Sequence, residues 1–330
     1  MLTPKENLLR VLHHQEAEYV PFIIMDAAMF GFGAGSGPWI EKGPAGGGLD
    51  GFGVRWITPA SGGGAPIPAP NEFLLKDVTE WKRVVQFPDV NAYDWAGDAE
   101  QDLAKYDRSQ VVIDYGCGNG IFERLAALMG FEEALVAMSE EPDAVNDLFT
   151  AITDYKIAFA EKVAAYYKAD TFTNYDDIAT ERDLFMSPAT YRELVKPHHK
   201  RLYDAVRNSG MIPIQHTCGR AESVIEDMIE IGAEAWTSVQ PSNDIAGLLE
   251  KYGGKIALIG GYDTNGIPGR GDAAGEIVKA EIDRCFTEYA PYKKGFVLFA
   301  FRLYDTHDPN AAYGLKPIIE AVIERRKAGR

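Results

Sequence analysis

Short apolar runs alternate with longer amphipathic segments along most of the chain. Seven of these runs are almost continuously apolar, which is typical of strands buried on both faces of a parallel sheet. They lie at residues 20–25, 110–115, 170–175, 211–215, 234–239, 255–259 and 295–301. Strands of this kind with helices between them favour a (β/α)8 TIM-like barrel over a doubly wound sheet.

The segments between the runs carry apolar residues at three- and four-residue steps, the pattern of helices that bury one face. Ser187 followed by Pro188 predicts a helix start, because serine caps helices and proline suits the first turn. The predicted helices span residues 121–138, 142–168, 188–208, 222–231, 245–252, 273–289 and 309–326. We expect one domain over residues 1–330.

Residues 31–76 interrupt this alternation. They are rich in glycine and proline and contain glycine triplets at 46–48 and 62–64. Residues 54–57 within them predict one arm of a small hairpin. The insertion is either a flexible surface loop or, as is more common for long loops in compact domains, a cover for a binding site or a contact for a partner.

Charge and cysteine content exclude several classes of function. Against 33 Lys and Arg stand 49 Asp and Glu, so the net charge of -16 disfavours binding to nucleic acid. No apolar run approaches the roughly 20 residues that cross a bilayer, and the charged N-terminus does not resemble a signal peptide. Three widely spaced cysteines fit a reducing cytoplasm rather than a disulfide framework. We therefore expect a cytoplasmic protein with no nucleic-acid or membrane partner.

Polar side chains follow the predicted strands at their carboxyl ends, where α/β folds place catalytic groups. The first strand is followed by Asp26, and the fourth by His216 and Cys218. The other strand ends supply Tyr115, Asp176, Asp177, Glu181, Gln240, Tyr262, Asp263, Arg302, Tyr304 and Asp305, and the loop after the last strand adds His307. This convergence indicates an enzyme; the alternative is a barrel that binds a ligand without converting it.

His216 and Cys218 alternate along one extended segment, so both side chains face the same side. Imidazole and thiolate suit Zn²⁺, and a catalytic zinc needs about three protein ligands and one open position. We assign the third ligand to Glu181, with Asp176 and Asp177 as alternatives. The competing interpretation is a histidine and a small core cysteine, each satisfied locally.

A glycine-rich turn follows the second predicted strand. Residues 111–120, with Gly116, Gly118 and Gly120, resemble the first glycine motif of S-adenosylmethionine methyltransferases. That fold needs a second strand ending in an acidic residue roughly 20 residues on, by analogy with dinucleotide sites. Residues 121–168 predict two helices and no strand there. A tight strand-to-helix turn facing the pocket is therefore the favoured interpretation.

Several segments occur in a characteristic order and spacing. They are residues 5–12, 20–22, 177, 185–197, 216–219, 239–245 and 255–263. Together they resemble the uroporphyrinogen decarboxylase superfamily over nearly the whole chain, and the resemblance implies a distorted (β/α)8 barrel. The resemblance also suggests a homodimer, as does the amphipathic helix that carries His198 and His199, which we expect on the surface or at an interface.

Two branches of this superfamily differ in their motifs. The decarboxylases carry arginines after the first strand that hold substrate carboxylates, whereas residues 25–30 here contain Asp26 and no arginine. A carboxylate in that place would repel a polycarboxylated substrate, which argues against porphyrin decarboxylation. The cobalamin-dependent methyltransferases look similar through their His-x-Cys-Gly motif, matched by residues 216–219. Members that methylate thiols add a third cysteine near the last strand, and residues 298–302 contain none.

Residues 234–240, 264–266 and 301–303 look more like the branch that demethylates methoxylated aromatics. The resemblance therefore implies a methyltransferase (O-demethylase) that moves a methyl group from a methoxylated aromatic compound to the cobalt of a corrinoid protein. The corrinoid would arrive on a separate subunit, with the 31–76 insertion as a docking surface. Alternatives are transfer from methylcorrinoid to a thiol or pterin, and decarboxylation. Catalytic roles are predicted for Asp26, Glu181, Tyr262 and Asp263, and substrate-binding roles for Tyr115, Asp177, Trp236, Gln240, Phe301 and Arg302.

Overall fold

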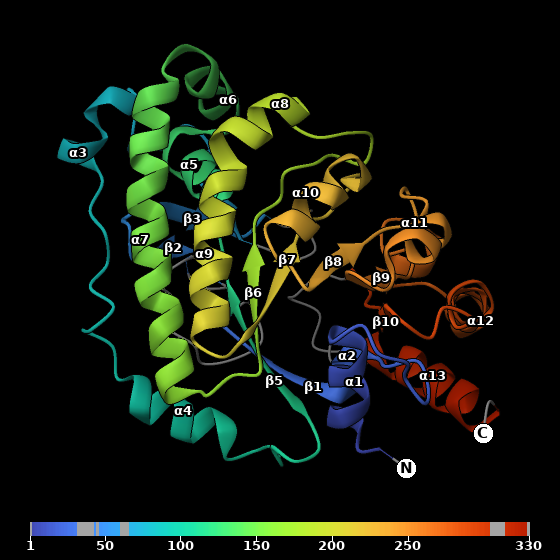
Figure 1. The fold of residues 1–330 in the computed structure, drawn as a ribbon. Coiled ribbons are helices and arrows are strands. Elements are labelled where there is room, and N and C mark those ends of the chain that lie inside the picture. Colours follow the sequence, from blue (N-terminus) through green and yellow to red (C-terminus); the bar gives the residue numbers. More distant parts are fainter. Residues whose placement is uncertain (1, 32–42, 44–45, 60–65, 304–313, 329–330) are drawn as a thin grey trace.

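The computed structural model describes residues 2–31, 43, 46–59, 66–303 and 314–328. Within them, seven parallel strands form one curved sheet with helices packed around it (Figure 1). In spatial order the strands are β1 (Ala27–Phe30), β5 (Val112–Cys117), β6 (Thr171–Tyr175), β7 (Ile212–His216), β8 (Ala235–Val239), β9 (Ala257–Gly261) and β10 (Phe296–Phe299). Phe22, just ahead of β1, pairs in parallel with Leu298 of β10, which links the two edges of the sheet. The predicted TIM-like barrel is confirmed, with seven strands in the sheet of the described residues instead of eight.

The two faces of the sheet support two separate apolar cores. Side chains alternate between the faces along each strand. Val112, Ile214 and Val297 lie on the inner face and cluster with Leu8 and Leu12 of α1 (Pro4–Leu12), so α1 covers the amino ends of the strands. The outward side chains pack under the surrounding helices in a second, larger cluster. The amino end of the barrel is therefore filled by apolar side chains, and the carboxyl end is left for polar ones.

Each predicted helix has a helical counterpart among the described residues, although residues 309–313 of the last one lie outside them. The helices of the described residues are α1, α2 (Ile23–Asp26), α3 (Trp81–Val84), α4 (Trp95–Leu103), α5 (Ile121–Met129), α6 (Phe131–Glu140), α7 (Pro142–Tyr166), α8 (Pro188–Thr190), α9 (Lys196–Asn208), α10 (Ile225–Glu230), α11 (Ile245–Tyr252), α12 (Gly275–Tyr289) and α13 (Lys316–Ala328), of which α1 to α4 were not predicted. The helix predicted over 121–138 is two helices, because Gly130 has a φ of 93° and lies against the ring of Phe73. Ser187 caps α8 as predicted, its hydroxyl accepting from the backbone N–H of Thr190 at 3.0 Å. None of the described helices is long and apolar enough to cross a membrane.

The first predicted strand, residues 20–25, does not match a strand in the structure. Residues 23–26 form the helical turn α2, and β1 begins only at Ala27. Asp26 accepts the N–H of Phe22 at 2.8 Å and pairs with Arg326 of α13 at 2.6 Å. This buried carboxylate stabilises the turn, and because it precedes β1 it lies at the amino end of the barrel. The expectation that Asp26 ends a strand beside the catalytic groups is wrong.

The described part of the insertion forms a small antiparallel sheet of β2 (Gly48–Leu49), β3 (Arg55–Ile57) and β4 (Ile67–Pro68). The predicted hairpin arm corresponds to β3. Asp50 joins this sheet to the barrel, because its carboxylate accepts from the guanidinium of Arg124 on α5 at 2.7 Å with both side chains fully buried. The same guanidinium lies 4.0 Å from the ring centroid of Phe52. These contacts anchor the insertion, so a wholly flexible loop does not describe it.

Candidate active site

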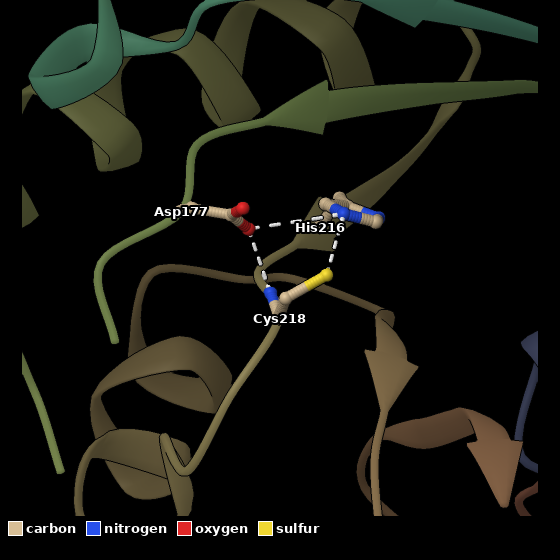
Figure 2. A group of neighbouring side chains, drawn as sticks. All are labelled: Asp177, His216 and Cys218. Carbon is tan, nitrogen blue, oxygen red and sulfur yellow. Dashed lines mark hydrogen bonds and ion pairs between the residues drawn. The ribbon is translucent and has the colours of Figure 1, made fainter. Parts of the chain in front are cut away.

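Three metal-ligating side chains lie together at the carboxyl ends of β6 and β7 (Figure 2). His216 is the last residue of β7, Cys218 follows in the next loop, and Asp177 follows β6. Each offers one ligand atom, and these atoms all lie within 4.8 Å of one another. No other group of three or more His, Cys, Asp or Glu side chains within the described residues meets this condition.

The spacing of these atoms fits a tetrahedral zinc site. Cys218 Sγ lies 3.5 Å from His216 Nε2, and Asp177 Oδ1 lies 3.8 Å from the same nitrogen. Ideal zinc–ligand distances place a nitrogen and a sulfur ligand about 3.6 Å apart and a nitrogen and an oxygen ligand about 3.3 Å apart. All three side chains are half-buried, so a fourth position can face an incoming ligand. The three side chains fit the ligand set of a zinc site, and within the described residues no fourth His, Cys, Asp or Glu belongs to the group. Asp177 occupies the place that we assigned to Glu181.

The surroundings of the cluster orient its members. The backbone N–H of Cys218 donates to Asp177 Oδ1 at 2.7 Å, which fixes the carboxylate. The ring of Tyr175 packs on the imidazole of His216 with the centroids 4.3 Å apart. Burial raises the pKa of the Cys218 thiol, and the charge of Asp177 raises it further. Because coordination requires the thiolate, a bound cation would have to displace the thiol proton.

Asp176 explains why its neighbour Asp177 faces the cluster. Its buried carboxylate accepts the backbone N–H groups of Ile121 and Glu123 at 2.9 Å each, and so caps α5. It also pairs with His199 Nε2 of α9 at 2.7 Å, with both side chains fully buried. Adjacent residues of an extended segment point to opposite sides, so anchoring Asp176 among the helices directs Asp177 toward β7.

The same contacts correct two expectations. His198 and His199, which we predicted on the surface or at an interface, are both buried. The prediction of a homodimer therefore rests on the family resemblance alone. The glycine-rich turn before α5 is closed by Asp176, because a Cβ on Gly120 would lie 2.2 Å from the Cβ of Asp176. The protein's own carboxylate accepts the N–H groups at the N-terminus of α5, so these groups are not free to bind an anionic ligand.

A polar cavity lies beside the cluster, at the carboxyl ends of β8 and β9. It has a volume of about 260 Å³ and is lined by Glu181, Gln240, Pro241, Ser242, Asp263, Thr264 and Asn265. Gln240 connects it to the cluster, since its Oε1 accepts the N–H of Gly219 at 3.0 Å. The structure thus brings together three predicted site residues, Glu181, Gln240 and Asp263. Glu181 is exposed and lies outside the group of metal ligands, contrary to our assignment.

Tyr115 and Trp236 point away from the barrel interior. Tyr115 packs against Phe159 of α7 with the ring centroids 5.8 Å apart, and it is fully buried. Trp236 is fully buried as well, and its Nε1 donates to the carbonyl of Thr217 at 2.9 Å. Both occupy outward positions of their strands and belong to the core under the helices. The prediction that they line a substrate slot is wrong, because the strand alternation turns them to the other face.

Tyr262, Arg302 and Phe301 follow the last two strands without lining the polar cavity. The hydroxyl of Tyr262 donates to the carbonyl of Pro268 at 2.8 Å, and burial raises the pKa of this phenol. The guanidinium of Arg302 donates to carbonyl groups of residues 270–273, so it holds a loop instead of a substrate. Phe301 packs on the ring of the preceding Phe299. Three further predicted contributors lie outside the described residues: Tyr304, Asp305 and His307.

One polar residue inside the barrel had been assigned no role. Asp114 lies on β5, is buried, and accepts the hydroxyls of Thr171 and Thr173 at 2.6 and 2.8 Å. Burial raises the pKa of this carboxyl to about 6. Its signal in the sequence was a charged residue inside an otherwise apolar run, at an inward position two residues after Val112.

A model of the uroporphyrinogen decarboxylase (URO-D) family matches residues 57–299. The chain belongs to the uroporphyrinogen decarboxylase family. The structure of a methyltransferase from Methanosarcina mazei superposes on this URO-D member with a TM-score of 0.69 and 14% identity, covering 99% of this chain and 100% of that chain, which shows a shared fold. Xylanase B from Clostridium stercorarium F9 matches at 13% identity and a TM-score of 0.41 over 64% of this chain and 73% of its own. No curated protein matches the sequence.

Because the chain belongs to this family, the absence of the arginines that decarboxylases carry after the first strand is informative. No arginine occurs between Arg10 and Arg55, so the segment after β1 of this URO-D member has none to hold substrate carboxylates. The expected repulsion of a polycarboxylated substrate by Asp26 is wrong. That carboxylate lies at the amino end of the barrel and is paired with Arg326.

Proposed function

We propose that this URO-D family member is a methyltransferase that moves a methyl group from a methoxylated aromatic compound to the cobalt of a corrinoid protein. The observation that carries the proposal is the cluster of Asp177, His216 and Cys218 at the open end of the barrel. The shared fold with a methyltransferase from Methanosarcina mazei supports methyl transfer. The absence of arginine after β1 supports it over decarboxylation of a polycarboxylate.

The chemistry needs a way to stabilise the departing oxygen. The methyl carbon passes to the reduced cobalt of the partner protein while its bond to the ether oxygen breaks. The electron pair stays on that oxygen, which then takes up a proton. A Zn²⁺ ion held by Asp177, His216 and Cys218 would supply Lewis-acid polarisation of the ether oxygen. The predicted proton donors for this oxygen are Glu181 and Asp263. The predicted docking surface for the corrinoid protein is the 31–76 insertion.

The decisive test combines the purified protein with a corrinoid protein in its cobalt(I) state and a series of methoxybenzenes. We expect the absorption spectrum of methyl-cobalt to appear, together with the corresponding phenol. If no methoxybenzene yields methyl-cobalt, the demethylase proposal fails. Transfer of methyl from a methylated corrinoid to a thiol or a pterin would then favour the reverse-direction alternative.

Metal content tests the cluster separately. We expect about one zinc per chain in the wild-type protein and loss of zinc in His216→Ala and Asp177→Ala, because each variant removes one of three ligands. Glu181→Gln is the matched control and should keep its zinc, since Glu181 lies outside the cluster. Loss of zinc in Glu181→Gln with retention in Asp177→Ala would restore the assignment of Glu181 as third ligand.

A further inference from the structure

The polar cavity beside the cluster is lined by acidic, amide and hydroxyl groups. We call it the mouth cavity and define it by the seven lining residues given above. Two of them, Glu181 and Asp263, are carboxylates, and none is lysine or arginine. Asp263 Oδ1 already accepts the N–H of Gly266 at 2.8 Å, which leaves Oδ2 for a further partner. The exposed Glu181 side chain makes no hydrogen bond or ion pair with the described residues. Among the described residues, the wall of the cavity therefore carries two carboxylates and no lysine or arginine.

Gln240 contributes a donor whose orientation is fixed. Its side chain is only 9% exposed, and its Oε1 accepts the N–H of Gly219. A backbone N–H can only donate, so the amide oxygen must occupy this position and the Nε2 group must point elsewhere. Within the described residues Nε2 has no hydrogen-bond partner, and the residue lines the mouth cavity. The buried hydroxyl of Ser242, in the same wall, also lacks a partner there.

These unpaired groups point to a ligand. A ligand group that accepts from Gln240 Nε2 meets a donor whose orientation is already fixed, and such a hydrogen bond contributes about 0.5–1.5 kcal/mol. No group of three or more Asp, Glu, His or Cys side chains of the described chain includes Glu181 or Asp263, so the cavity lacks the ligand set of the cluster. The volume of about 260 Å³ suits one end of a single-ring compound.

Residues around the mouth cavity are close in sequence to residues of the cluster. Gly219, which donates to Gln240, directly follows Cys218. Glu181 lies four residues after Asp177, in the loop whose Thr180 carbonyl accepts the N–H of Arg220. One compound can therefore place one end at the cluster and the other end in the mouth cavity.

We propose that the mouth cavity binds the end of the methyl donor remote from its methoxy group, and that it selects an ammonium or hydroxyl substituent over a carboxylate. This specificity rests on the proposed methyl transfer, since it concerns the same methyl donor. It gives Glu181 and Asp263 a recognition role at the remote end of that donor, in place of the proton-donor role predicted for them. An ammonium donates to the carboxylates and is attracted by their charge, whereas a carboxylate is repelled. A hydroxyl can both donate to Glu181 and accept from the amide nitrogen of Gln240, so it binds without the charge attraction.

The test uses three donors that differ only in the remote substituent: para-methoxybenzylamine, para-methoxybenzyl alcohol and para-methoxybenzoate. Calorimetry gives the Kd of each with the metal-loaded protein, and methyl-cobalt formation gives kcat and KM. We expect the amine to bind most tightly and the benzoate at least about ten-fold more weakly, a difference of about 1.4 kcal/mol. Equal affinities, tighter binding of the benzoate, or no binding of any of the three would overturn the proposal.

Variants locate the selectivity in the cavity. Glu181→Gln combined with Asp263→Asn removes both charges at nearly constant volume, and we expect the preference for the amine over the benzoate to collapse toward one. Glu132→Gln, an exposed position on α6, removes a charge outside the cavity and should leave the preference unchanged. Gln240→Leu should weaken binding of the alcohol. If the double variant keeps the wild-type preference, the carboxylates do not recognise the remote substituent. If it lowers kcat equally for all three donors, the carboxylates act as general acids and the recognition role is contradicted.

The binding measurement separates this inference from the proposed function. If no donor forms methyl-cobalt but calorimetry gives the expected order of affinities, the demethylase proposal fails while the cavity's selectivity stands. If methyl-cobalt forms with all three donors at the same KM and Kd, the demethylase proposal stands and the inference about the mouth cavity fails.

Discussion

Asp114→Asn would test the buried carboxyl on the inner face of β5. This side chain accepts two threonine hydroxyls inside the barrel, and burial raises its pKa from 3.8 to about 6. Asparagine retains an oxygen that can accept both hydroxyls, but it cannot ionise. The substitution therefore removes the titration while disturbing the packing little.

The sign and size of the effect follow from linkage. The folded protein holds this proton more tightly than the unfolded chain, so the stabilisation is complete below the unfolded pKa and is lost as the pH rises through about 6. The rise from 3.8 to about 6 corresponds to about 3 kcal/mol in all. About half of this should be lost between about pH 5 and about pH 8.

The assay is guanidinium unfolding of the wild type and Asp114→Asn at these two pH values. Other titrating groups cancel in the difference between the two proteins, so the wild type should lose about 1–2 kcal/mol relative to the variant as the pH rises. The exposed Asp143→Asn on α7 controls for the loss of one negative charge. A difference between wild type and Asp114→Asn that does not change with pH would refute the reasoning, because it would mean that the fold does not favour the protonated carboxyl.

Three further experiments test contacts that anchor the site and the insertion. Arg124→Met should lower the free energy of unfolding by about 3–5 kcal/mol, because it leaves Asp50 buried without its ion pair. Adding Asp50→Asn to this variant should restore part of the lost stability in the same denaturation experiment. Asp26→Asn should lower the melting temperature without changing kcat for methyl transfer, and a loss of kcat in the folded variant would return Asp26 to the active site. Gly120→Ala should cost about 1–3 kcal/mol by denaturation, because its new methyl group meets Asp176, and unchanged stability would show that the turn can open.

The pattern of apolar and polar residues along the sequence was enough to predict the barrel and the pair His216 and Cys218. Apolar runs of strand length with helices between them predict parallel strands, and six of the seven runs match strands in the structure. His216 and Cys218 were found because two residues of one extended segment share a face, a property that depends only on local geometry. Ser187 was identified as a cap for the same reason, since its hydroxyl bonds a backbone group three residues away.

The tertiary structure decided which neighbours join that pair. Glu181 and Asp177 looked equivalent as carboxylates after β6, and the distinction came from Asp176, which is held by α5 and α9 and so turns Asp177 toward His216. The inward or outward direction of Tyr115 depends on the register of its strand against the helices. The position of Asp26 depends on its ion pair with Arg326, in a helix near the other end of the chain. Such contacts join residues far apart in sequence, so no local periodicity carries them. Local geometry therefore determines that a site exists here, and long-range packing determines its members.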